Sequence, residues 1–242
     1  MSFFALKTIA LLSMLYDHAA NVWPCVTGGA LPLPLQHAVH YLGRIAAPIF
    51  LFSIANGYRH TRSVRRYALR LLVFACLAEY PYYLLFEAHG NILFTLLLGL
   101  VTLHLLETLN RRHRNLGYLA AGTVVVLAEL LALSEGKGRY LLFILVFYLT
   151  DAWPRRKKLL LWLLLLPLGR YAFTWDILTQ AAAGTLALRW FQLWALNAMG
   201  PILGVILTFF YNGRRGPAFP GDKYIWYIAY PAHLLLFGLL RP

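Results

Sequence analysis

The sequence contains little charge. Only 13% of its 242 residues are Asp, Glu, Lys or Arg, and only 9 of them are acidic. Hydrophobic residues make up 60% of the chain, and the mean hydropathy is +0.63. A chain of this length could form one or two soluble domains, but this composition excludes an ordinary charged surface and favours a polytopic membrane protein.

Cysteine is scarce as well, and the chain shows no internal repeat or low-complexity tract. Cys25 and Cys76 are too few and too separate to form a disulfide framework. The histidines are spread over different segments without clustered carboxylates or thiols, so we expect no metal site. With no extramembrane domain visible, residues 1–242 are expected to form a single transmembrane domain.

Apolar segments recur along the whole chain and are separated by short polar connections. They lie near residues 4–22, 40–57, 68–86, 91–106, 117–134, 140–153, 159–174, 193–211 and 224–240. A helix rises about 1.5 Å per residue and the hydrocarbon layer is about 30 Å thick, so the shorter segments are half-spans or include polar flanks. The predicted fold is an all-α, polytopic transmembrane bundle of about eight to nine spans.

Basic residues collect in alternate connections, which predicts the orientation of the chain. The connections that carry them are represented by Arg59 to Arg66, Arg111 to Arg114, Arg155 to Lys158, and Arg214 to Lys223. Because Lys and Arg mark cytoplasmic loops, we expect a multi-pass protein with a cytoplasmic N-terminus. The formal net charge of +13 then reflects membrane topology and the lipid bilayer, and no nucleic-acid partner is expected.

Asp17 and His18 stand side by side inside the first apolar segment. A charged side chain near the bilayer centre costs about 2.5 to 3.5 kcal/mol on insertion scales, so such residues favour a functional interpretation. His18 shares a helical face with Lys7, and Asp17 lies on an adjoining stripe with Ser13. An adjacent acid and imidazole suit a general base and its orienting partner, whereas the structural alternative is a buried pair bonded to neighbouring groups.

Other ionisable residues within or near apolar segments need partners. Arg44 is always charged, and Asp17 is the expected counterion, with structural pairing and ligand binding equally open. Glu79 precedes Pro81 and is expected to pair with an arginine of a neighbouring helix. Asp151 is expected to lie at the membrane interface beside Arg155.

A basic cluster precedes and opens the third segment. Its arginines Arg62, Arg66 and Arg70 recur at helical spacing, and Arg59 comes just before them. Such clusters often set topology or contact anionic lipid. The alternative is a phosphate site for a nucleotide-bearing cofactor, because arginine side chains bind phosphate oxygens well.

Four motifs in order resemble the TraX family of conjugative pilin acetylases. They are Leu6 to His18 (LKTIALLSMLYDH), Gly43 to Phe50 (GRIAAPIF) with Gly57 to Arg62 (GYRHTR), Gly90 to Thr95 (GNILFT), and Pro220 to Lys223 (PGDK) continuing to Tyr230 to Leu234 (YPAHL). The resemblance runs from end to end, although residues 107–195 match mainly as apolar spans.

This resemblance implies an enzyme that transfers acetyl from acetyl-CoA to the N-terminal amine of a membrane-inserted pilin subunit. It also implies a fold similar to integral-membrane acyltransferases and a location in the bacterial inner membrane. His18 would be the general base, and Arg44 or Asn91 would stabilise the oxyanion. The residues expected to act in catalysis are Asp17, His18, Arg44, Asn91 and His233. Those expected to bind the cofactor acetyl-CoA are Lys7, Arg59, Arg62, Arg66 and Arg70.

Other functions fit the same residues. A related acyltransferase would modify a lipid or a lipid-linked glycan. A non-catalytic pilus assembly protein would need the apolar surface but not the acid and the imidazole. A small transporter would also bury such groups, but it usually has repeated, Gly- or Pro-broken spans, which are not found in this sequence.

Overall fold

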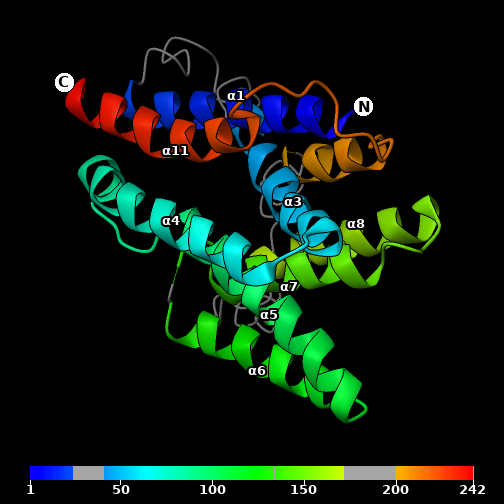
Figure 1. The fold of residues 1–242 in the computed structure, drawn as a ribbon. Coiled ribbons are helices and arrows are strands. Elements are labelled where there is room, and N and C mark those ends of the chain that lie inside the picture. Colours follow the sequence, from blue (N-terminus) through cyan, green and yellow to red (C-terminus); the bar gives the residue numbers. More distant parts are fainter. Residues whose placement is uncertain (24–40, 133, 172–199, 242) are drawn as a thin grey trace, which may run out of the picture. The chain divides into compact units, whose positions relative to one another are not determined.

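The protein is entirely helical in the part that the structure describes. The computed structural model describes residues 1–23, 41–132, 134–171 and 200–241. Its helices are α1 (Phe3–Val22), α3 (Ala46–His60), α4 (Val64–Phe86), α5 (Ile92–Arg112), α6 (Leu116–Leu130), α7 (Lys137–Leu149), α8 (Arg155–Tyr171), a short helix Gly200–Phe209 and α11 (Asp222–Leu239) (Figure 1). No strand occurs in these ranges, which confirms the predicted all-α class.

The helices follow the predicted apolar segments closely. The segment at 193–211 is described only from Gly200 onwards, and the one at 159–174 only to Tyr171. The predicted segment at 40–57 is not one helix, because Arg44 and Ile45 form a turn and α3 begins at Ala46. Pro48 explains the break, since its ring lacks an N–H for the Arg44 carbonyl and would clash with that carbonyl in a continuous helix.

Two helices, α4 and α5, are both long and apolar enough to cross a membrane among the residues described. α6 with 15 residues and α7 with 13 are shorter. At about 1.5 Å per residue, each of them reaches only about 20 Å. The structure therefore shows two membrane-capable helices, fewer than the predicted eight to nine spans.

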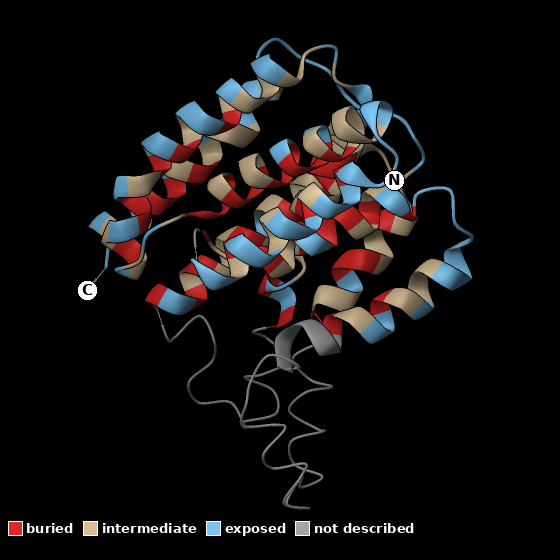
Figure 2. Ribbon diagram, turned by 90° about the horizontal axis from the view of Figure 1, so that it is seen from below, coloured by how far each residue is buried: buried red, intermediate tan, exposed pale blue. Residues whose placement is uncertain are grey.

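The chain forms two compact units, which we describe separately. Unit 1 comprises Met1–Ile49 and Ala152–Gly216, and unit 2 comprises Phe50–Asp151 and Pro217–Pro242. The boundary therefore falls within α3 and just after α7. Figure 2 shows that buried residues run in stripes along the helices, as expected for helices that pack through one face.

In unit 1, α1 buries a stripe at i, i+4 spacing that contains Leu6, Ala10, Met14 and His18. Ser2 caps the helix by accepting a hydrogen bond from the Ala5 N–H at 3.2 Å. Just before it, the Phe3 N–H donates to the Arg214 carbonyl at 2.9 Å. The start of α1 is thus held by a side-chain cap and by the segment that follows Gly200–Phe209.

In unit 2, α4 and α5 form an antiparallel hairpin, and α11 packs along α4. Phe74 of α4 stacks on Tyr227 of α11 with ring centroids 5.3 Å apart, and Gly238 faces Leu84, so α4 and α11 run parallel. α6 packs against α5 and α7, and α7 also contacts α5. Exposed leucines such as Leu69, Leu72 and Leu77 line the outer face of α4, a surface that suits lipid contact.

Most arginines of unit 2 gather at one end, where Glu107 and Asp151 also lie, and four glutamates lie at the other end together with Arg139 and Arg241. The basic end, as we call it, contains the end of α3, the start of α4 and the end of α5, with the arginines Arg59, Arg62, Arg65, Arg66, Arg111, Arg112 and Arg114. The opposite end contains the connection between α4 and α5. Its acidic residues are Glu79, Glu87, Glu129 and Glu135.

The helix Gly200–Phe209 packs closely on residues 41–48 within unit 1, which generates a prediction. A Cβ added at Gly204 would lie 2.6 Å from the Ile45 carbonyl oxygen and 3.2 Å from Pro48 Cγ. We expect Gly204→Ala to lower stability by about 1 to 3 kcal/mol through overpacking. Gly122→Ala is the matched control, because a Cβ at this exposed position of α6 meets nothing within 4 Å. Thermal unfolding in detergent should show a lower Tm only for Gly204→Ala.

Candidate functional site

Asp17 of α1 is held against the turn that precedes α3. Arg44 Nε lies 3.8 Å from Asp17 Oδ1, which confirms the predicted pairing, and their side chains are 48% and 16% exposed respectively. The Ser13 hydroxyl, one helical turn before Asp17, donates to the Leu42 carbonyl at 2.5 Å. Gly43 leaves room for the carboxylate, because a Cβ there would clash with Asp17.

His18 belongs to a different face of α1. Its ring is 9% exposed and continues the buried stripe of Met14 and Ala10, as predicted for an inward-facing imidazole. Lys7 is half-buried instead, and its Nζ lies 4.5 Å from the Phe3 ring centroid. Since successive helical residues diverge by about 100°, Asp17 points toward Arg44 while His18 points into the packed stripe. This geometry favours Asp17 as the partner of Arg44 over Asp17 as the orienting group of His18.

In unit 2, Asn91 is completely buried at the start of α5 and is engaged by its neighbours. Its Nδ2 donates to the Ala75 carbonyl at 2.9 Å and to Glu79 Oε2 at 2.7 Å, while Oδ1 accepts from the Leu93 N–H at 3.1 Å. A side-chain amide has two hydrogens, and both are used here. The predicted oxyanion role for Asn91 therefore lacks an available donor, and Asn91 instead fixes the α4–α5 connection.

Glu79 is the other half of this network. One carboxylate oxygen accepts from the Gly90 N–H at 2.8 Å and lies 3.3 Å from His89 Nδ1. No arginine that the structure describes pairs with Glu79 as expected; N–H groups of residues 89–91 surround the carboxylate instead. The reason is local: the short connection after α4 turns these N–H groups back toward the helix that carries Glu79.

His233 of α11 is buried, with 6% of its surface exposed. Its Nδ1 lies 2.8 Å from the Ala229 carbonyl oxygen, and its ring contacts those of Tyr230 and Phe237 at centroid distances of 5.6 Å. A carbonyl only accepts, so Nδ1 carries the hydrogen and the lone pair of the neutral ring lies on Nε2.

Two further buried polar residues of unit 2 were not singled out from the sequence. The Thr95 hydroxyl lies 2.9 Å from Ser134 Oγ and also contacts the Glu135 carbonyl. Thr95 follows Asn91 by four residues and therefore shares its helical face, which was the available signal. Ser134 had no such signal, because only the packing of α5 brings it close.

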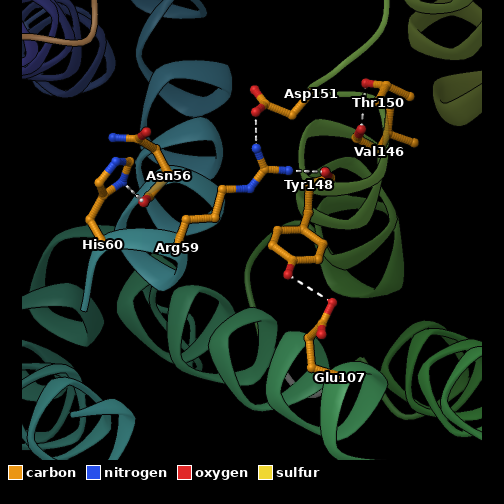
Figure 3. Close-up of polar contacts among 8 residues, drawn as sticks. All are labelled: Asn56, Arg59, His60, Glu107, Val146, Tyr148, Thr150 and Asp151. Carbon is orange, nitrogen blue, oxygen red and sulfur yellow. Dashed lines mark hydrogen bonds and ion pairs between the residues drawn. The ribbon is translucent and has the colours of Figure 1, made fainter. Parts of the chain in front are cut away.

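Arg59 at the basic end is bound by other residues of unit 2 (Figure 3). Its guanidinium pairs with Asp151 and donates to the Tyr148 carbonyl at the end of α7, and it lies 4.6 Å from the Tyr148 ring centroid. Partial burial lowers the pKa of Arg59, an effect that Tyr148 and Glu107 oppose. Arg59, which was predicted to bind the cofactor, forms an internal ion pair in this structure, and Asp151 pairs with Arg59 where we expected it beside Arg155.

The remaining arginines of the basic cluster differ in their environments. Arg70 is half-buried, with its guanidinium 5.5 Å from the Tyr67 ring centroid. Arg62, Arg65 and Arg66 are exposed, and their side chains make no hydrogen bond or ion pair to any residue that the structure describes. These three guanidinium groups can therefore meet an external anion.

The predicted site residues divide between the two units. Unit 1 contains Lys7, Asp17, His18 and Arg44, and it brings Asp17 and Arg44 together. Unit 2 contains the predicted residues Asn91, His233, Arg59, Arg62, Arg66 and Arg70, with Asn91 and the arginines at opposite ends of the α4–α5 hairpin. Within the described residues, no three His, Cys, Asp or Glu side chains are grouped so that they could hold a metal ion.

One family model and one relative match nearly the whole chain. The family model described as TraX protein matches residues 2–241. A relative from Dichelobacter nodosus, the probable fimbrial assembly protein FimC of serogroup H1, is 28% identical over 250 residues, which cover 97% of this chain and 93% of the relative. No solved structure matches the chain.

The Glu79 network predicts an effect on stability. We expect Glu79→Gln to lower the free energy of unfolding by about 1 to 3 kcal/mol, because the neutral amide accepts fewer and weaker hydrogen bonds from residues 90 and 91. Glu87→Gln is the control, since the Glu87 side chain is 74% exposed and pairs with Arg241 at 3.2 Å. Its effect should stay below about 0.5 kcal/mol. Equal losses of stability in chemical denaturation would contradict this interpretation.

Proposed function

Because this chain belongs to the TraX family, we propose that it is an acetyl-CoA-dependent acetyltransferase of the bacterial inner membrane. The acceptor is the N-terminal amine of a membrane-inserted pilin subunit. The name of the Dichelobacter relative, a probable fimbrial assembly protein, supports a pilin-related partner. The apolar α4 and α5 support a place in the membrane.

The observation that carries this proposal is the buried imidazole of His18 beside the Asp17–Arg44 pair. α1 is otherwise apolar along its buried stripe, so an imidazole there does not serve packing better than a leucine would. Buried ionisable groups in apolar helices default to a functional interpretation. Acyl transfer to an amine needs a proton acceptor and gains from a positive group near the oxyanion, and His18 and Arg44 of unit 1 are the candidates for these roles.

In the proposed reaction, the neutral amine of the acceptor attacks the carbonyl carbon of the acetyl thioester. The neutral His18 ring takes the proton from the attacking nitrogen as the tetrahedral intermediate forms. The carbon–sulfur bond then breaks, and the coenzyme A thiolate leaves and receives that proton. The products are the acetylated amine and free coenzyme A.

Arg44 is the better oxyanion partner of the two residues predicted for this role. Its Nε faces Asp17, and no described residue pairs with the two terminal nitrogens of the guanidinium, which can donate to a developing negative charge. A donor of this kind is typically worth about 10² to 10³ in rate. Asn91 instead supports the connection between α4 and α5. His233, with its lone pair on Nε2, is a candidate for a second proton acceptor.

The basic end of unit 2 suits the phosphates of coenzyme A. Three exposed arginines, Arg62, Arg65 and Arg66, lie close together at the start of α4 and just before it. The first turn of α4 contains no acidic residue. Guanidinium groups bind phosphate oxygens through paired hydrogen bonds. If the basic end faces the cytoplasm, it faces the compartment that contains acetyl-CoA.

A second candidate is a non-catalytic role in pilus assembly, which the printed name of the relative favours. Such a protein would present its apolar helices to pilin subunits and would not need the imidazole of His18. An acyltransferase with a lipid or lipid-linked glycan acceptor would keep His18 and Arg44 but modify another amine or hydroxyl.

Replacement of His18 tests the chemistry. We expect His18→Gln to reduce acetyl transfer to a pilin peptide by about 10² to 10⁴, because the amine loses its proton acceptor. The measurement is mass spectrometry of the peptide after incubation with isotopically labelled acetyl-CoA. His113→Gln, at an exposed position after α5, is the control and should retain full activity. Normal pilus formation by cells that carry only His18→Gln would instead support the assembly role.

Removal of the three exposed arginines tests the donor site. The triple variant Arg62→Gln, Arg65→Gln, Arg66→Gln should raise the KM for acetyl-CoA about tenfold to a hundredfold, since each lost phosphate contact weakens binding. The control removes the same charge from the same end of unit 2 by changing Arg111, Arg112 and Arg114 to Gln. An equal rise in KM for both variants would assign the arginines to general electrostatics and topology.

A further inference from the structure

We infer that Arg59 is a positioning residue, which fixes the connection between α3 and α4 and so places the arginines that bind the phosphates of the donor. This inference rests on the proposed function, because it takes Arg62, Arg65 and Arg66 as the phosphate ligands. It gives Arg59 a role different from theirs, although all four belong to the same basic end.

The contacts of Arg59 tie three helices together (Figure 3). Its guanidinium, at the end of α3, binds both the Asp151 carboxylate and the Tyr148 carbonyl at the end of α7. From α5, Glu107 accepts a hydrogen bond from the Tyr148 hydroxyl at 2.8 Å. The ends of α3, α5 and α7 are therefore joined through Arg59 and the two polar groups of Tyr148.

The choice of arginine follows from the geometry of the contact. The last carbonyls of a helix have no partner within that helix, so the Tyr148 carbonyl needs a donor from elsewhere. A planar guanidinium can donate to this carbonyl and to the Asp151 carboxylate at the same time and can also stack on the Tyr148 ring. Lysine keeps the charge but lacks this fork.

The short connection between α3 and α4 makes the position of the exposed arginines depend on the end of α3. Only three residues, Thr61 to Ser63, separate the two helices. The Thr61 hydroxyl accepts from the Ser63 N–H at 3.3 Å, and the Ser63 hydroxyl accepts from the Arg66 N–H at 3.3 Å. Because the connection is short and internally bonded, the start of α4 follows the end of α3, which Arg59 holds.

Arg59 differs from the exposed arginines in its availability. Its side chain is 29% exposed, and its donors already bind a carboxylate and a carbonyl. An entering phosphate would have to displace Asp151, whereas Arg62, Arg65 and Arg66 have no such partner among the described residues. A substitution of Asp151 should therefore free the guanidinium of Arg59 directly. It should affect Arg62, Arg65 and Arg66 only by changing the position of the connection between α3 and α4.

The test compares Arg59→Lys, Asp151→Asn and their combination in the full-length protein in nanodiscs. Calorimetry measures the Kd for coenzyme A, steady-state kinetics measure kcat and KM, and hydrogen exchange measures protection of the amides of residues 60–66. We expect Arg59→Lys to raise Kd and KM by about tenfold with kcat within about twofold, and to speed the exchange of these amides. Asp151→Asn should act in the same way.

The combination distinguishes positioning from direct contact. The double variant Arg59→Lys, Asp151→Asn should bind coenzyme A no more weakly than either single variant, because both substitutions break the same contact. The effects of Arg62→Gln and Asp151→Asn on the Kd should be less than additive, because Asp151 acts by placing Arg62 and its neighbours. The charge exchange Arg59→Asp, Asp151→Arg should restore part of the affinity for coenzyme A that the single variants lose. Ile144→Val, in the buried core of α7, controls for lost stability and should leave the Kd unchanged.

Each remaining result decides against one claim. If the unchanged protein binds no coenzyme A, the donor part of the proposed function fails, and hydrogen exchange alone still shows whether Arg59 holds the connection. If the protein binds coenzyme A but Arg59→Lys alters neither Kd nor exchange, the positioning role is overturned. Additive losses from Arg59→Lys and Asp151→Asn would also overturn it, since Arg59 would then contact the phosphates itself.

Discussion

A charge within an apolar helical protein needs a partner, and this requirement organises the polar residues of both units. Asp17 pairs with Arg44 in unit 1, and Arg59 pairs with Asp151 in unit 2. Glu79 reaches the same result without a cation, through N–H groups of residues 89–91. Each of these contacts fixes a connection between helices, because a polar partner can only be supplied where the chain turns or a helix ends.

Pairing also separates residues that support the structure from residues that can meet a ligand. Both amide hydrogens of Asn91 are donated to neighbouring groups, and the guanidinium of Arg59 donates to the Tyr148 carbonyl. Both side chains therefore stabilise the structure around them. The exposed arginines Arg62, Arg65 and Arg66 have no such partner among the described residues, and the proposal assigns phosphate binding to them and acetyl transfer to His18 and Arg44. The proposed acetyl transfer uses this second set, and the first set keeps it in place.

The sequence predicted the helices well, since apolar segments bounded by Arg clusters, Gly and Pro define their limits with little ambiguity. It did not predict the turn at Arg44 and Ile45, although Pro48 was visible four residues later, because the apolar pattern continues through it. Nor does hydropathy alone decide how many of these helices cross a membrane. Several, such as α7, are shorter than the hydrocarbon layer is thick.

By itself, the sequence determined the helical class, the family, and the types of residue available for catalysis, because periodicity, composition and short motifs are local properties. It also identified Asp17 as the partner of Arg44, since few acids were available in the apolar segments. Only the tertiary structure decided that Asn91 binds Glu79, that Arg59 binds Asp151 and that Thr95 meets Ser134. These contacts join residues of different helices or of the connections between them, and their geometry depends on how the helices pack, which no spacing along the chain specifies.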